Sequence, residues 1–180
     1  MLRMIFISLL MLSVAACNGA TDLQDLPVPL GDFRLGHNIV VAPKARKGPL
    51  SRDASKEELT IALQTAIAER FDRYDGEKLY HFGVSVEGYV LAAPGVPIVL
   101  APKSIMVVGV TVWDNDANAK MNEKPHQITV FESLDQGPLF GSGYTKTAEE
   151  QLKNLSQNVA KAIERYLSTQ KTKESWFTGE

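Results

Sequence analysis

The sequence is poor in the side chains that most often carry catalysis or bind metals. It has one cysteine, Cys17, and three histidines, His37, His81 and His126. A single cysteine cannot form an internal disulfide, no serine stands in a nucleophile elbow such as G-x-S-x-G, and no two histidines have the H-x-x-x-H spacing of zinc ligands. The histidines fall within or beside expected strands, where a hydrogen-bonded or solvated imidazole is the rule. We therefore expect no catalytic residue, no metal, no cofactor and no enzyme.

A strong charge of either sign is also missing. The chain holds 19 Lys and Arg against 21 Asp and Glu, a formal net charge of -2. A nucleic-acid-binding domain usually has a strongly positive balance, so we expect no nucleic acid among the partners. With 44% hydrophobic residues the chain has the composition of a folded protein. Its 180 residues suffice for one domain with its own core.

Long apolar runs are absent after the first residues of the chain. Arg3 is followed by an apolar run from Met4 to Ala16 in which two serines are the only polar residues. A membrane-spanning helix needs about 20 apolar residues, so this run is too short to span a bilayer. A positive charge followed by a short apolar run is the layout of a secretory signal peptide. We expect residues 1–16 to be such a signal.

The apolar run ends on the tetrapeptide Val14-Ala15-Ala16-Cys17. It resembles the lipobox of bacterial lipoproteins, which consists of an aliphatic residue, two small residues and a cysteine. The resemblance implies that the signal is cut before Cys17 and that the Cys17 thiol carries lipid, which would anchor the mature protein stably to a membrane. An uncleaved anchor, or an ordinary signal peptide with an incidental cysteine, is the alternative.

The residues that follow Cys17 indicate which membrane the protein is sorted to and how far the domain stands from the lipid. In many enteric bacteria an Asp directly after the cysteine keeps a lipoprotein in the inner membrane, and here that residue is Asn18. By this resemblance we expect the outer membrane, with the protein facing the periplasm. Residues 17–32 contain two prolines at positions 27 and 29, and we expect them to form an extended, polyproline-like tether between the lipid and the domain.

Hydrophobic periodicity predicts a domain over residues 33–170 with the order β-α-β-β-β-α. Alternating or β-branched apolar stretches predict strands over 33–41, 79–92, 105–113 and 127–132. Capping boxes at Ser55 and Thr147 begin two helices with one apolar side each, the first of which should end at Asp75-Gly76. The expected fold is α+β, a two-layer sandwich with two helices on one face of a four-stranded mixed sheet. Residues 171–180 would form a C-terminal tail.

Two short motifs resemble ligand sites only in part. The segment from Asp114 to Asn118 begins like a calcium-binding loop, but Ala119 and Pro125 occupy the positions of its glycine and its bidentate glutamate. We predict a polar turn, with weak cation binding as the alternative. Gly141-Ser142-Gly143 lacks the Lys-Ser/Thr pair of a phosphate-binding loop, and we interpret it as a flexible approach to the second helix.

Three features are candidates for partner binding. A basic cluster suits an anionic surface or an acidic partner protein, with a solvated loop as the alternative; it consists of Lys44, Arg46, Lys47 and Arg52. Trp176 and Phe177 stand in an otherwise polar tail and either pack on the domain or serve as a docking anchor. The apolar loop at Val96–Leu100 leaves the same choice open.

The order of lipobox, tether and small α+β domain resembles, by architecture alone, several envelope accessory lipoproteins. Among them are the partner of the lipopolysaccharide-transport barrel and activators of peptidoglycan synthases. The resemblance implies a non-catalytic binding or assembly accessory for an outer-membrane or periplasmic partner, which could be a protein or a polymer. The alternative is a module that binds a small ligand in a pocket between sheet and helices. An envelope hydrolase ranks third, because no triad or metal set stands out.

Overall fold

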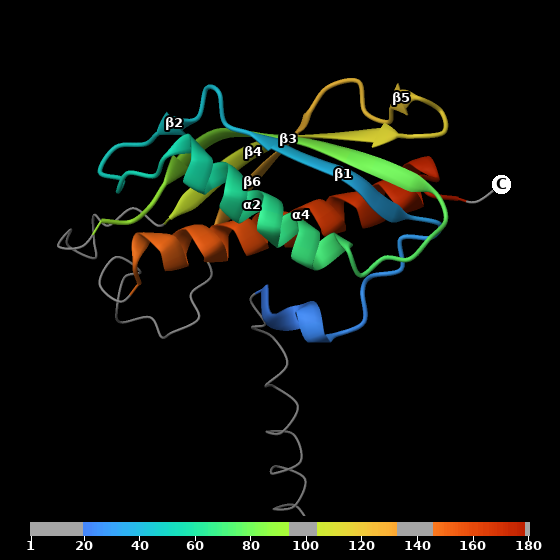
Figure 1. Cartoon of the computed structure of the whole chain (residues 1–180), viewed down its shortest axis with the longest axis horizontal. Helices are drawn as coiled ribbons and strands as arrows, with labels where there is room; N and C mark the ends of the chain where they lie inside the picture. Colours follow the sequence, from blue (N-terminus) through green and yellow to red (C-terminus); the bar gives the residue numbers. More distant parts are fainter. Residues whose placement is uncertain (1–19, 94–103, 133–145, 179–180) are drawn as a thin grey trace, which may run out of the picture.

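The domain consists of a mixed sheet that lies over two helices (Figure 1). The computed structural model describes residues 20–93, 104–132 and 146–178. Its elements in chain order are η1 (Ala20–Gln24, a short 3₁₀ helix), β1 (Arg34–Val41), β2 (Arg46–Lys47), α2 (Lys56–Phe71), β3 (Leu79–Val90), β4 (Ile105–Asp114), β5 (Ala119–Lys120), β6 (His126–Phe131) and α4 (Ala148–Glu174). The predicted α+β fold is confirmed, and all four expected strands are present.

The sheet is built on the four long strands β1, β3, β4 and β6. β1 pairs with β3 in parallel, whereas β3 with β4 and β4 with β6 pair antiparallel. The two-residue strands β2 and β5 add to β3 and β4 respectively, which sequence periodicity did not predict because two residues show no alternation. The parallel β1–β3 pair needs a crossover connection, and α2 supplies it.

Both helices begin at the residues that the capping boxes predict. The side chain of Ser55 accepts from the amide of Glu58, whose carboxylate accepts from the amide of Ser55. Thr147 and Glu150 make the same reciprocal pair at the start of α4. These bonds satisfy amide groups that would otherwise have no partner in the first turn of a helix.

The two helix ends differ from prediction. α2 ends at Phe71, whereas the sequence predicted an end at Asp75-Gly76. The chain leaves the helix earlier because the Tyr74 ring packs against the Phe33 ring, with their centroids 5.4 Å apart. α4 continues through Glu174, so the first four residues of the predicted tail, 171–174, are helical. No glycine or proline interrupts this stretch, and Ser175, in the left-handed conformation, ends the helix.

The core lies between the sheet and the helices. β3 and β4 contribute alternate buried residues to it, and so do the apolar sides of α2 and α4. The opposite face of β4 carries further apolar residues that are only half-buried: Ile105, Val107 and Trp113. β4 is central in the sheet, as predicted, but only one of its two faces is fully covered. None of the helices in the described part of the chain combines the length and apolar character that a membrane crossing requires.

We expect Leu63→Ala and Val159→Ala each to lower the free energy of unfolding by about 2–4 kcal/mol. Both side chains are fully buried, one on each helix, so truncation removes buried volume and leaves a cavity. Urea unfolding measures the effect, and Ile61→Ala, a truncation of an exposed side chain on α2, is the matched control. Unchanged midpoints in both core variants would mean that the buried faces of the helices are misassigned.

Candidate functional site

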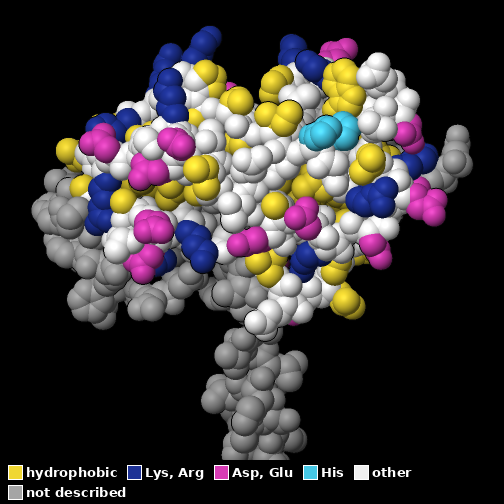
Figure 2. All heavy atoms as spheres, in the orientation of Figure 1, with side chains coloured by type: hydrophobic (Ala, Val, Ile, Leu, Met, Phe, Trp, Pro, Cys, Tyr) yellow, Lys and Arg dark blue, Asp and Glu magenta, His cyan; other side chains and the backbone are white. Residues whose placement is uncertain are grey.

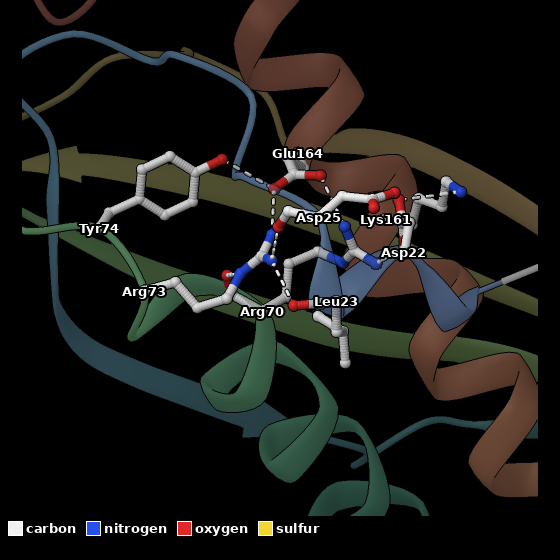
Figure 3. A network of polar contacts seen from close by, with 8 residues as sticks. All are labelled: Asp22, Leu23, Asp25, Arg70, Arg73, Tyr74, Lys161 and Glu164. Carbon is white, nitrogen blue, oxygen red and sulfur yellow. Dashed lines mark hydrogen bonds and ion pairs between the residues drawn. The ribbon is translucent and has the colours of Figure 1, made fainter.

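The segment next to the predicted lipid anchor is held against both helices by a polar network (Figure 3). Asp22, in η1, lies between Arg70 of α2 and Lys161 of α4. Its carboxylate oxygens are 2.6 Å from Arg70 Nη2 and 3.0 Å from Lys161 Nζ. One carboxylate in η1 therefore connects the N-terminal segment to both helices of the domain.

Glu164 of α4 is the second carboxylate of this network. Its Oε2 is 2.7 Å from Arg70 Nη1, and its Oε1 accepts a hydrogen bond of 2.7 Å from the hydroxyl of Tyr74. The side chains of Arg70 and Glu164 are only 2% and 5% exposed. Because they are buried, each charge depends on the other for the interactions that water would otherwise supply.

Arg73 extends the network to the backbone of the N-terminal segment. Its Nη1 donates to the carbonyl oxygens of Leu23 at 2.9 Å and of Asp25 at 3.0 Å. These two carbonyls belong to the residues one and three positions after Asp22, so the Asp22 side chain and the backbone that follows it are both bound to the domain. The predicted extended tether of residues 17–32 is therefore partly folded, because residues 22–25 are bound to the domain.

The network shifts the pKa values of its members. Partial burial would raise the pKa of Asp22, but the hydrogen bonds and charges of Arg70 and Lys161 outweigh it and lower that pKa. Burial, together with the bond to Glu164, raises the pKa of the Tyr74 hydroxyl, which therefore stays protonated and donates. Since the pKa of Asp22 is lowered by folding, its contribution to stability is present above the ordinary aspartate pKa. That contribution is lost as the pH falls through the lowered value.

A second set of contacts holds the same segment at its C-terminal end. The amide of Asp32 donates to the carbonyl of Phe177 at 3.0 Å, and Lys171 Nζ donates to the carbonyl of Pro29 at 2.8 Å. Gly31 has a positive φ of 97°, and a Cβ there would lie 2.6 Å from the Phe177 carbonyl oxygen, so only glycine fits this approach. The segment that leads from the predicted anchor into β1 is thus bound to the residues that follow α4.

Trp176 and Phe177 belong to the core. They are 9% and 2% exposed. The centroid of the Phe177 ring lies 5.1 Å from that of Phe33 and 4.7 Å from that of Tyr80. Of the two alternatives that the sequence left open, the structure favours packing on the domain. Side chains buried in this way are not available as an exposed docking anchor in the folded protein, so we no longer assign that role to them.

The basic cluster lies at the surface around β2. Lys44, Arg46 and Lys47 are exposed, and Lys47 Nζ makes an ion pair of 2.6 Å with Asp53. Arg52 donates from Nη1 to the carbonyl of Lys146 at 3.0 Å. The cluster is accessible, but Lys47 and Arg52 are partly engaged within the domain. Partner binding by these residues remains a prediction.

The other polar motifs have structural partners. Both ring nitrogens of His81 are engaged: Nδ1 accepts from the amide of His37 at 2.8 Å, and Nε2 is 3.1 Å from Asn115 Oδ1. Asp114 Oδ1 accepts from the amides of Asp116 and Ala117, which is the geometry of a polar turn. Within the described ranges, no group of three or more His, Cys, Asp or Glu side chains is placed to hold a metal ion.

Several predicted features lie outside the described residues. They are the signal peptide of residues 1–16, Cys17, Asn18, the apolar loop Val96–Leu100 and Gly141-Ser142-Gly143.

A groove of about 600 Å³ lies between α2, along most of its length, and the N-terminal part of α4. Its floor is apolar and includes Ala66, Leu91 and Leu152, and four carboxylates stand among its lining residues: Asp53, Glu58, Glu69 and Glu149. Figure 2 shows acidic side chains around apolar ones on this helical side. The groove lies between the two helices rather than between sheet and helices, where a ligand pocket was expected.

Sequence reasoning missed the polar network, although a signal was present. Arg70 follows Leu63 and Ile67 at helical spacing, so it stands in phase with the buried side of α2. Glu164 likewise follows the buried residue Ala160 by four positions on α4. Two opposite charges in phase with two buried stripes indicate a buried ion pair between helices.

The comparisons with known proteins give distant structural similarity. A Xanthomonas campestris protein of family DUF330 shares 11% identity at a TM-score of 0.47, over 83% of this chain and 93% of that one. A candidate lipoprotein from Caulobacter crescentus shares 14% sequence identity at a TM-score of 0.41, and the match covers 81% of this chain and 93% of that one. PelC of Paraburkholderia phytofirmans, solved as a dodecamer, shares 10% sequence identity at a TM-score of 0.36, and the match covers 73% of this chain and 91% of that one. No protein-family model and no curated protein matches the sequence. At these values the similarity carries no functional argument.

Proposed function

We propose that the protein is a bacterial envelope lipoprotein with a non-catalytic binding or assembly role. Residues 1–16 would be removed, Cys17 would carry lipid, and the domain would be held at the outer membrane, facing the periplasm, where it serves an outer-membrane or periplasmic partner. The observation that carries the proposal is the tetrapeptide Val14-Ala15-Ala16-Cys17, followed shortly by a segment that both helices hold. Residues 22–32, here called the anchor segment, lie between the proposed anchor and β1 and are bound to the domain near both ends. A domain that fixes this segment is suited to a defined position at a membrane.

The chemistry of the described residues supports a role without catalysis. The charged groups that the fold brings together, Arg70 and Glu164, are buried and bonded to each other, so they offer no free acid or base to a substrate. His81 is engaged at both nitrogens. Accessible charge lies instead on the surface, in the cluster of Lys44, Arg46 and Lys47, which we propose as part of a binding surface.

The groove between α2 and α4 favours a second candidate function. Its volume of about 600 Å³ lies within the range of roughly 300–1,000 Å³ that small-molecule sites occupy. Its apolar floor would suit the apolar part of a small amphiphile. Asp53 is paired with Lys47 and Glu58 accepts from the amide of Ser55, so a cationic head group would meet Glu69 and Glu149, with Lys153 also among the lining residues. In that case the protein would be a small-ligand-binding module of the envelope.

The anchor is tested by Cys17→Ser in the full-length protein expressed in a bacterial host. We expect the variant to lose acylation and either to appear in the soluble periplasmic fraction or to stay unprocessed, because the chain has no other cysteine. Fractionation followed by immunoblotting measures this. Asn18→Ser, which changes the neighbouring residue and keeps the thiol, is the control. Membrane retention of a cleaved, unlipidated Cys17→Ser protein would refute the anchor.

A further inference from the structure

The loop of residues 26–29, here called the proline loop, exposes apolar side chains close to the proposed anchor. Leu26 is 95% exposed, the highest value among the exposed large hydrophobic residues in the described part of the chain, and Val28 is 40% exposed. An isolated exposed leucine needs no explanation. Here, however, it stands beside a second exposed apolar residue and two prolines, in the segment that connects Cys17 with the domain.

The covalent connection keeps this loop near the membrane if Cys17 carries lipid. Only three peptide units separate Cys17 from Ala20, and at about 3.6 Å per residue they span at most about 11 Å. η1 begins at Ala20 and is bound to the helices through Asp22. The start of the folded chain is therefore confined to a short distance from the lipid headgroups.

Side chains hold the proline loop at both of its ends. Before it, Arg73 donates to the carbonyl of Asp25, and within it, Lys171 donates to the carbonyl of Pro29. Leu30, directly after the loop, is buried. Leu26 therefore remains at the surface unless these contacts break, because the loop is fixed on either side.

Lys171 places a cation at the C-terminal end of the loop, and a positive charge is attracted to anionic headgroups. Arg73, at the other end, is only 20% exposed and lies 3.5 Å from the Glu164 carboxylate, so its charge is taken up within the polar network. The carboxylate of Asp25, which is exposed, opposes this attraction at one end. The charges beside the loop are thus nearly balanced, and the exposed apolar side chains of Leu26 and Val28 are what suits the interface between headgroups and acyl chains.

We propose that the proline loop contacts the lipid bilayer and that the domain rests on the membrane with the η1 side of its helices. This inference depends on the proposed lipid anchor at Cys17. Figure 1 shows η1 and the chain that leaves it on one side of the helices, with the sheet on the other. In Figure 2, apolar side chains protrude at this lower edge of the described surface. The open face of the sheet, which exposes Ile39, would then point into the periplasm, where a partner could reach it.

The test compares thiols placed on different sides of the domain. Leu26→Cys, Ile39→Cys and Leu50→Cys replace apolar side chains that are 95%, 58% and 64% exposed, so none should disturb folding. In the lipidated full-length protein the only natural cysteine is already modified, and each introduced thiol is the single target for the fluorophore NBD. The labelled proteins are incorporated into vesicles of phosphatidylethanolamine and phosphatidylglycerol with a quencher attached to the acyl chains.

We expect NBD at position 26 to shift its emission to shorter wavelength and to be quenched severalfold more strongly than NBD at positions 39 and 50. Equal quenching at all three positions would overturn the proposed orientation, and so would stronger quenching at position 39. In both of these cases, acylated Cys17 would still support the proposed anchor. A free Cys17 thiol, detected by labelling of the unsubstituted protein, would instead refute the anchor and this inference together.

Discussion

Arg70→Met is expected to lower the free energy of unfolding by about 3–5 kcal/mol. The substitution preserves much of the side chain's apolar length but removes a charge that contacts Glu164 at 2.7 Å and Asp22 at 2.6 Å. Glu164 would remain buried without its main cation, and a charge left in this state is costly. The loss should also release η1, since Asp22 would keep only Lys161 as a cationic partner among the contacts described here.

Urea unfolding of a soluble form with Cys17→Ser measures the change in stability, and hydrogen exchange of residues 22–25 measures the release of η1. Lys47→Met is the matched control, because it removes the cation of the exposed Lys47–Asp53 pair. Exposed ion pairs contribute about 0–1 kcal/mol. The buried network does not hold the anchor segment if Arg70→Met is as stable as Lys47→Met. The same conclusion follows if residues 22–25 of Arg70→Met stay protected from hydrogen exchange.

Phe177→Ala is expected to cost about 3–5 kcal/mol of unfolding free energy. The ring is buried against Phe33 and Tyr80, so its removal leaves a cavity where the C-terminal end of the chain meets the anchor segment. The carbonyl that accepts from Asp32 belongs to the backbone and remains. The effect should therefore come from lost packing rather than from that hydrogen bond.

Thermal or urea unfolding separates the two roles that the sequence allowed for this aromatic. Leu26→Ala, which truncates an exposed side chain in the same part of the molecule, should change stability by less than about 0.5 kcal/mol. A Phe177→Ala protein with unchanged stability and weakened binding to an envelope partner would restore the docking role and contradict the core position.

The fold could be predicted from the sequence because its signals are local. The capping boxes at Ser55 and Thr147 depend on residues within one turn, and the alternation of β3 depends on neighbours two positions apart. Local signals do not fix how a helix ends when a tertiary contact competes. Tyr74 illustrates this, because its packing on Phe33 draws the chain out of the helix before Asp75.

The candidate site was harder to predict because its contacts are distant in sequence. Arg70 and Glu164 are separated by 94 residues, and although each stands in phase with the buried side of its own helix, neither helix alone indicates which opposite charge it meets. Asp22 stood in a segment whose prolines and polar residues indicated an extended tether. The buried position of Trp176 and Phe177 likewise follows from contacts with Phe33 and Tyr80, which no local pattern encodes. The resemblance to a lipobox, by contrast, rests on four contiguous residues, Val14-Ala15-Ala16-Cys17, and is visible without the structure.

The central claim is that the mature protein begins at a lipid-modified Cys17. Mass spectrometry of the N-terminal peptide, prepared from the membrane fraction of cells that express the full-length chain, tests this claim most directly. The account predicts a peptide that starts at Cys17 and carries the mass of attached acyl chains. A peptide that retains residues before Cys17, or one that begins at Cys17 with an unmodified thiol, would contradict it.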